Sequence, residues 1–225
     1  MTYDMLIRKK ALKIQERLGM RIGISNGTAD IPNPRNASDV INILTELYKI
    51  GLRAYVFPKE FFSNIKTTTD LYKVEYGNLL KIKDIAQKYN IELSLHNSGL
   101  PDDPVALDNT LITFGNIASI MDCRIFVVHP TFYKNMPQEQ AVKLAVYKIN
   151  ELIPTMKSKI SFGIETTGRI NEVGTIEDVI DIVKRTKGTE PVINWAHIHA
   201  RGSGSLRSQT DFRKILDYVR ASVGQ

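Results

Sequence analysis

The sequence is poor in cysteine, histidine and tryptophan, and it lacks any long apolar run. Because Cys123 is the one cysteine, the chain cannot form an internal disulfide, which is usual for proteins of a reducing compartment. Cys123 begins an apolar, strand-like segment, so we expect a buried and unreactive thiol. No segment approaches the roughly 18 consecutive apolar residues needed to cross a membrane. We therefore expect a cytoplasmic protein without a membrane partner.

The chain contains both acidic and basic residues, with a moderate excess of basic ones. The sequence has 30 Lys and Arg against 24 Asp and Glu, which gives a formal net charge of +6. This surplus permits attraction to a polyanion such as nucleic acid. The basic residues are spread along helical stretches and form no dense block, so the sequence has no basic tail.

Apolar, strand-like segments alternate with amphipathic helical segments from residue 20 to residue 225. We expect the strands at RIGISNG (21–27), LRAYVFP (52–58), IELSLHN, CRIFVVHP, KISFGIETT and PVINWAHIHA. We expect the helices from Ser38 onward and at 69–89, 105–121, 137–153, 175–186 and 208–222. This alternation predicts an α/β fold with a parallel sheet wrapped by helices. The expected architecture is a (β/α)8 TIM-barrel type, incomplete with about six of its eight units.

Residues 1–19 precede the first expected strand and form a separate N-terminal extension. Their sequence pattern predicts a basic, weakly amphipathic helix. The barrel domain is then expected to comprise residues 20–225. One interpretation is an added helix that covers the floor of the barrel. The alternative is a basic arm or a helix that lies on a membrane surface.

All four histidines fall in or just after the apolar strand-like runs. His96 and His129 end two of these runs, Glu165 ends a third, and His197 and His199 lie in the last. The ends of parallel strands converge on one mouth of a barrel, and imidazole and carboxylate groups are the usual ligands of zinc there. The pattern predicts a metal site. In a strand, His197 and His199 would share one face.

The strand-end motifs resemble those of the endonuclease IV family of apurinic/apyrimidinic endonucleases, within the xylose isomerase-like barrels. The residues that carry the resemblance are His96 in LSLHNSG, His129 before a proline, Glu165 in GIETTG, and the segment 192–197. Each motif is short, and their order and spacing over about residues 20–220 carry the resemblance. It implies hydrolysis of the DNA backbone 5′ to an abasic site during base-excision repair.

The resemblance also implies a set of zinc ligands. Family members hold three Zn²⁺ ions, and His96, His129 and Glu165 match the ligands of the first. Glu165 is also the carboxylate that bridges to a second ion, which gives it a catalytic role. His197 matches a ligand of the third ion.

Two departures from the family reduce the expected metal content. Asn194 stands where the family has an aspartate ligand, and a neutral amide is a weaker partner for zinc. His199 is an extra imidazole, which we interpret as a substitute ligand, a proton donor or a structural residue. The family's ligands from its seventh and eighth strands have no counterpart in this sequence. We therefore expect one tightly held Zn²⁺ and weak incision by this chain alone.

The resemblance makes double-stranded DNA with abasic sites the expected partner. Asn26 and Arg35 lie in the first strand–helix loop, where family members reach toward DNA. Family members insert an aromatic and an apolar side chain into the duplex to displace the damaged nucleotide. Leu100 matches the apolar side chain, and this chain has no aromatic residue to match the other. Arg201 begins the run RGSGS, whose N–H groups could cradle a phosphate, although such a run is also typical of a flexible loop.

Two alternatives to a nuclease stay open. A sugar isomerase or epimerase of the same superfamily would use one divalent ion, held by glutamate, aspartate and histidine, to move a proton. A non-catalytic fragment is the other alternative, with the missing strands supplied by a partner chain. A barrel with six units has two open sheet edges, which favours self-association.

Overall fold

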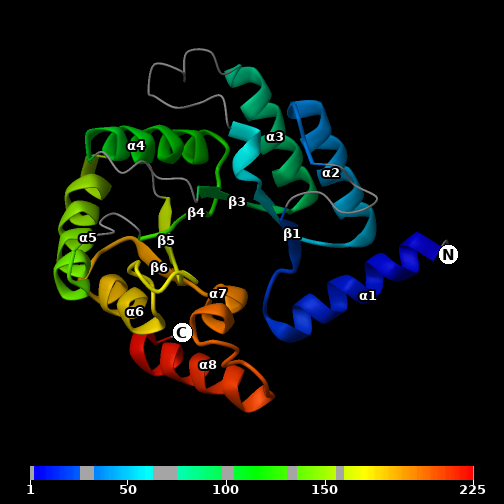
Figure 1. Ribbon diagram of the computed structural model, residues 1–225. Helices are drawn as coiled ribbons and strands as arrows, with labels where there is room; N and C mark the ends of the chain where they lie inside the picture. Colours follow the sequence, from blue (N-terminus) through cyan, green and yellow to red (C-terminus); the bar gives the residue numbers. More distant parts are fainter. Residues whose placement is uncertain are drawn as a thin grey trace. The chain divides into compact units, whose positions relative to one another are not determined.

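The computed structural model describes residues 3–25, 33–62, 75–97, 104–130, 136–155 and 160–224. Strands and helices alternate along this part of the chain (Figure 1). The strands are β1 (Gly23–Ser25), β2 (Ala54–Phe57), β3 (Glu92–Asn97), β4 (Ile125–Val128), β5 (Ser161–Glu165) and β6 (Thr189–Val192). The helices are α1 (Tyr3–Leu18), α2 (Ala37–Ile50), η1 (Lys59–Phe62), α3 (Tyr76–Tyr89), α4 (Pro104–Ile120), α5 (Gln138–Leu152), η3 (Ile153–Thr155), α6 (Ile176–Arg185), α7 (Trp195–Arg201) and α8 (Gln209–Val223).

The six described strands form one sheet in the order β1-β2-β3-β4-β5-β6. The pairs β1–β2, β2–β3 and β5–β6 are parallel. Strands that neighbour one another in both sequence and sheet, with a helix between them, are the repeating unit of a (β/α) barrel. This confirms the predicted α/β fold, in which parallel strands alternate with helices, and the expected helix before the first strand.

Close contact between β1 and β2 depends on a glycine. Gly23 lies opposite Ala54 in the parallel register. A Cβ atom added at Gly23 would lie 1.8 Å from the main-chain oxygen of Ala54. No side chain fits at such a distance, so this position of β1 requires glycine.

The strands differ in burial. All four residues of β4 are buried, whereas buried and half-buried residues alternate along β3. A parallel strand covered on both faces is expected to be a continuous apolar run, as IFVV is. Every residue of β6, at the end of the strand order, is only half-buried.

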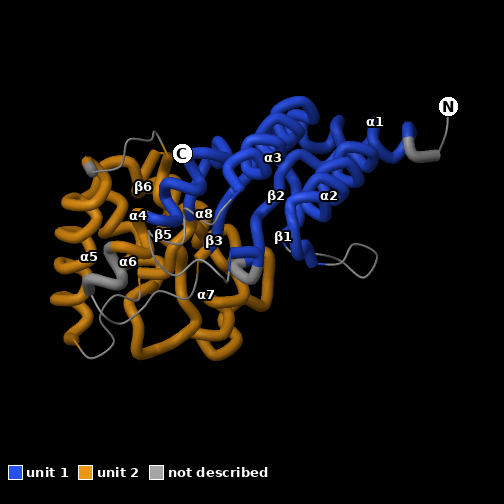
Figure 2. Tube along the Cα trace, turned by 90° about the horizontal axis from the view of Figure 1, so that it is seen from above, with its two compact units in different colours: residues 1–96, 113–126 blue, residues 97–112, 127–225 orange. Residues whose placement is uncertain are grey.

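The chain divides into two compact units (Figure 2). Unit 1 comprises residues 1–96 and 113–126, and unit 2 comprises residues 97–112 and 127–225. Aromatic side chains join the core of unit 1, where Phe62 packs edge-on against Phe114, and Phe114 stacks on Phe126. In unit 2, Ile164 of β5 and Val179 of α6 are fully buried. Each unit therefore has an apolar core of its own.

The predicted N-terminal helix is present and packs on α2 within unit 1. Gln15 is its buried anchor: the side-chain amide donates to the oxygen of Gly51 at 2.7 Å, and Oε1 accepts from the N–H of Ile22 at 2.9 Å. The guanidinium of Arg8 lies 3.9 Å from the ring centre of Tyr48. These contacts lie where the chain enters β1 and β2, which supports the interpretation of an added floor helix.

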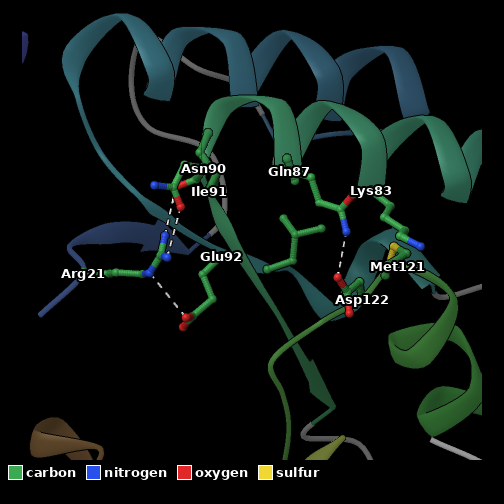
Figure 3. A pocket seen from close by; sticks show the side chains of 10 residues that line it. Arg21, Lys83, Gln87, Asn90, Ile91, Glu92, Met121 and Asp122 are labelled. Carbon is green, nitrogen blue, oxygen red and sulfur yellow. Dashed lines mark hydrogen bonds and ion pairs between the residues drawn. The ribbon is translucent and has the colours of Figure 1, made fainter. Parts of the chain in front are cut away.

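A polar pocket of about 280 Å³ opens in unit 1 near the start of β3. Arg21 donates to the backbone oxygen and the side-chain oxygen of Asn90 at 2.9 and 3.1 Å, and it pairs with Glu92 at 3.4 Å. Gln87 donates to the carboxylate of Asp122 at 2.8 Å. Figure 3 shows Arg21 directed toward Asn90 and Glu92, and Gln87 directed toward Asp122. These pairs link the chain before β1 to the start of β3, and α3 to the turn before β4.

The thiol of Cys123 is buried, as predicted, in the turn before β4. Burial raises its pKa well above the ordinary value, and the neighbouring charge of Asp122 raises it further. A thiol that stays protonated at neutral pH is a poor nucleophile.

Within the described residues, no helix is both long enough and apolar enough to cross a membrane.

Candidate metal centre

The predicted ligands come from the carboxyl ends of three successive strands. His96 is the penultimate residue of β3, His129 follows β4 directly, and Glu165 is the final residue of β5. In (β/α) barrels, the residues that follow the strands at this end build the active site. The sequence pattern placed all three side chains correctly.

His96, His129 and Glu165 each offer one ligand atom, and these atoms lie within 4.8 Å of one another. Nε2 of His129 is 2.6 Å from Oε2 of Glu165, and the two side chains are only 14% and 6% exposed. Two imidazoles and a carboxylate are a ligand set that suits Zn²⁺ and other divalent transition metals. Three protein ligands leave coordination positions open for a substrate or water.

Asn194 contacts the other oxygen of Glu165. Its side-chain amide donates to Oε1 of Glu165 at 2.9 Å. Asn194 is also the N-cap of α7, because its side-chain oxygen accepts from the N–H of His197 at 3.1 Å. The sequence predicted Asn194 as a weak metal ligand, whereas the structure shows it as a hydrogen-bond donor to Glu165.

The prediction that residues 191–200 form one strand is wrong beyond Val192. The strand β6 ends there, and the helix α7 begins at Trp195 behind its cap, Asn194. His197 therefore lies in the first turn of a helix. Its Nδ1 is 2.7 Å from the main-chain oxygen of Thr166. Its ring stands edge-on to that of His129, with 5.4 Å between the ring centres. His197 thus lies beside the centre but is not one of the three clustered ligands.

The prediction that His197 and His199 share a face is wrong for the same reason. Residues two apart on an α-helix point in nearly opposite directions. His199 is exposed, and its Nδ1 accepts a hydrogen bond from the N–H of Leu206 at 3.2 Å. Of the three interpretations offered by the sequence, this geometry favours the structural one.

Arg201 is bound to the loop after β5. One terminal nitrogen lies 2.6 Å from the oxygen of Arg169 and 3.4 Å from that of Thr167, and the other lies 3.3 Å from the oxygen of Ile170. The N–H groups of Gly202 and Gly204 donate to carbonyl oxygens of α7. These groups close the end of the helix, so they are not directed at a phosphate.

The other predicted DNA contacts are only partly described. Arg35 is exposed just before α2, and its N–H donates to the carboxylate of Asp39 at 2.8 Å. Asn26 and Leu100 lie outside the described residues. DNA contacts by these side chains stay predictions.

Sequence reasoning missed Thr166. Its hydroxyl accepts from the N–H of Asn194 at 2.9 Å, and its main-chain oxygen pairs with His197. The residue joins the end of β5 to the start of α7 and so holds the groups that surround Glu165. An asparagine before the short segment WAHIHAR is a typical helix N-cap, and this signal could have revealed the arrangement.

Comparison with known proteins gives the family. Residues 44–223 match the xylose isomerase-like TIM barrel family, so the chain belongs to it. An uncharacterised protein of Methanocaldococcus jannaschii is 24% identical over 206 residues, covering 88% of this chain and 71% of that protein. This confirms the broader part of the resemblance drawn from the sequence.

Solved structures with the same fold include enzymes of two kinds. SacUVDE, a UV damage endonuclease, matches with a TM-score of 0.63 and 14% identity, covering 100% of this chain and 71% of its own. D-psicose 3-epimerase from Clostridium cellulolyticum H10 matches with a TM-score of 0.59 and 13% identity over 80% of this chain. The chain spans 65% of that epimerase, less than two thirds of its length. At these identities, the matches establish the fold alone.

Proposed function

We propose that this xylose isomerase-like barrel is a divalent-metal-dependent sugar isomerase or epimerase. His96, His129 and Glu165 would hold one ion at the carboxyl ends of β3, β4 and β5. Zn²⁺ is the ion expected from the sequence, and the same ligands suit other divalent transition metals. The substrate would be a ketose or a related sugar with an acidic C–H bond beside its carbonyl.

The observation that supports this proposal is the single clustered ligand set. Among the described residues, His96, His129 and Glu165 are the one group of three such side chains whose ligand atoms come together. When bound, one divalent ion polarises a carbonyl or hydroxyl oxygen, which makes the adjacent C–H more acidic. Cleavage of a phosphodiester typically uses several ions on one phosphate. A one-ion site therefore suits proton transfer better than DNA incision.

The surrounding residues supply positioning and a proton acceptor. Glu165 is buried, so its charge would interact strongly with an ion bound in the centre. His197 is held through Nδ1 by Thr166, so its Nε2 is the ring atom able to take a proton from the substrate and return it. Its ring stands edge-on to that of His129, which places it beside the proposed ion.

The solved structures with a similar fold support the same substrate class. Several of them are sugar epimerases, including a 3-keto-D-glucoside 4-epimerase of E. coli. Sugar epimerisation was one of the alternatives left open by the sequence. We rank it above the nuclease because the described centre contains a single cluster of ligands.

The decisive experiment detects proton exchange at carbon. The metal-loaded protein is incubated with ketohexoses in D₂O, and NMR follows deuterium entering the position beside the carbonyl. We expect exchange that a chelator stops and that Glu165→Gln abolishes. The matched control is Glu177→Gln, which changes an exposed carboxylate on α6 and should leave exchange intact. A metal-loaded protein that exchanges no proton in any ketohexose or keto-glycoside would refute the proposal.

A DNA-directed activity is the second candidate, because SacUVDE matches the full length of the chain and the net charge is +6. Its partner would be duplex DNA with abasic sites or UV lesions. An incision assay on both substrates, with and without metal, tests this activity. Binding should weaken steeply as salt rises, because each neutralised phosphate releases counterions. Binding that does not change with salt would count against it.

A further inference from the structure

We infer that Asn194 is a positioning residue that restricts Glu165 to one metal-binding oxygen and so limits the centre to one ion. This inference rests on the proposed metal centre and deepens it. It concerns metal stoichiometry, which can be measured without knowing the substrate.

The contacts of Asn194 fix which way its amide points. A backbone N–H can only donate, and the N–H of His197 lies 3.1 Å from one side-chain atom of Asn194, which must therefore be the oxygen. The other side-chain atom is then the NH₂ nitrogen, and it lies 2.9 Å from Oε1 of Glu165. The backbone thus determines the orientation, and the amide presents a donor to the carboxylate.

Because of this donor, the two oxygens of Glu165 have different partners. Oε1 accepts from Asn194, whereas Oε2 lies 2.6 Å from Nε2 of His129, on the side of the ligand cluster. The usual way for a carboxylate to bridge two cations is to offer one oxygen to each. With Oε1 held by an N–H group, Glu165 offers one oxygen to a cation.

The charge of the centre supports the same conclusion. Asn194 is neutral and Glu165 is buried, so the pair carries one negative charge that water screens weakly. An aspartate at position 194 would place a second carboxylate against Oε1. A carboxylate has no hydrogen to donate to Oε1, so a cation could occupy the space between the two oxygens instead. A carboxylate at this position would therefore recruit a second ion, and asparagine prevents this.

The position of Asn194 is fixed from several sides. Its backbone N–H donates to the hydroxyl of Thr166 at 2.9 Å, and its side chain caps α7. Thr166 follows Glu165 directly, so this hydrogen bond ties the start of α7 to the end of β5. The amide needs no reorganisation when a cation binds to Glu165, which is how residues around a metal ligand increase affinity.

The test measures metal content and affinity in the full chain. Wild-type protein and the variants Asn194→Asp and Asn194→Ser are stripped with a chelator and titrated with Zn²⁺ and Co²⁺. Elemental analysis counts the ions retained, and calorimetry measures the affinity. Serine and aspartate are both good N-caps, so α7 should form in each variant, which circular dichroism checks. Asn36→Asp, at the N-cap of α2, is the matched control.

We expect one ion per wild-type chain and two per Asn194→Asp chain, with the second bound more weakly. Asn194→Ser should keep one ion and lose about 10- to 100-fold in affinity, because Glu165 loses its donor. Asn36→Asp should behave as wild type. Two tightly bound ions in the wild type, an unchanged count in Asn194→Asp, or wild-type affinity in Asn194→Ser would each overturn the inference. One ion without proton exchange in any sugar would instead refute the proposed function alone.

Discussion

The Nδ1 atom of His197 lies 2.7 Å from the main-chain oxygen of Thr166, which can only accept a hydrogen bond. The neutral ring of His197 must therefore carry its proton on Nδ1 and keep Nε2 free to accept. His199, two residues away, shows the opposite arrangement, because its Nδ1 accepts from the N–H of Leu206. One short helix thus holds two histidines in different tautomers.

We predict that nitrogen NMR of the neutral rings will separate these two histidines. His197 should show a protonated Nδ1, and His199 a protonated Nε2. Each histidine serves as the control for the other, and assignment follows from His199→Gln. Identical tautomers at both positions would contradict the described geometry.

Replacement of Arg201 should destabilise the protein whether or not DNA is a ligand. Its guanidinium donates to the oxygens of Arg169 and Ile170, which would lose a charged donor in Arg201→Ala. We expect a loss of roughly 1–3 kcal/mol in the free energy of unfolding, measured in urea. Arg213→Ala on the exposed side of α8 is the control and should change stability little. Weaker DNA binding at unchanged stability would show instead that Arg201 contacts the phosphates.

The anchor of α1 can be removed with one substitution. Gln15 is 3% exposed, and Gln15→Ala would leave the oxygen of Gly51 and the N–H of Ile22 without their partner. We expect a loss of roughly 2–4 kcal/mol in the free energy of unfolding, since each buried group left unpaired costs about 1–3 kcal/mol. Hydrogen exchange should quicken first in α1. Glu16→Ala, its exposed neighbour, should change neither stability nor exchange.

Acid should weaken the start of α8 through Asp211. The backbone N–H of Arg207 and the hydroxyl and N–H of Ser208 donate to its carboxylate, and these bonds lower its pKa. A lowered pKa in the folded state means that the carboxylate stabilises the helix above the ordinary aspartate pKa of roughly 3.9. This contribution disappears as the pH falls through the folded-state pKa.

We therefore expect Asp211→Ala to lower thermal stability at pH 7, with a difference that vanishes in strong acid. Asp217→Ala on the same helix is the control, and it should shift the melting temperature less. A difference between Asp211→Ala and wild type that persists unchanged at the lowest pH would contradict the assignment to the ionised carboxylate.

The sequence was sufficient to predict the strand–helix order and the strand-end positions of His96, His129 and Glu165, for a common reason. Each of these features depends on local periodicity and on the end of a strand, as at His129 and Glu165. The segment PVINWAHIHA shows where this logic fails. A short apolar run fits a strand or a buried helix equally well, and the cap at Asn194 decides between them. The helix expected from Ser38 likewise begins at Ala37, behind its N-cap Asn36.

Contacts between distant residues could not be read from the pattern. Asn194 meets Glu165 across 29 positions of sequence, and Arg201 meets Ile170 across 31. Whether an amide presents its oxygen or its nitrogen to a neighbour depends on the third group that it contacts, here the N–H of His197. Only the folded geometry provides that information.

The buried position of Cys123 makes the natural chain a ready background for site-specific labelling. Because it is the one cysteine and its thiol stays protonated, a maleimide dye would react with any cysteine newly placed on the surface. Fluorescent or spin probes could then be attached to chosen helices without first removing a native thiol.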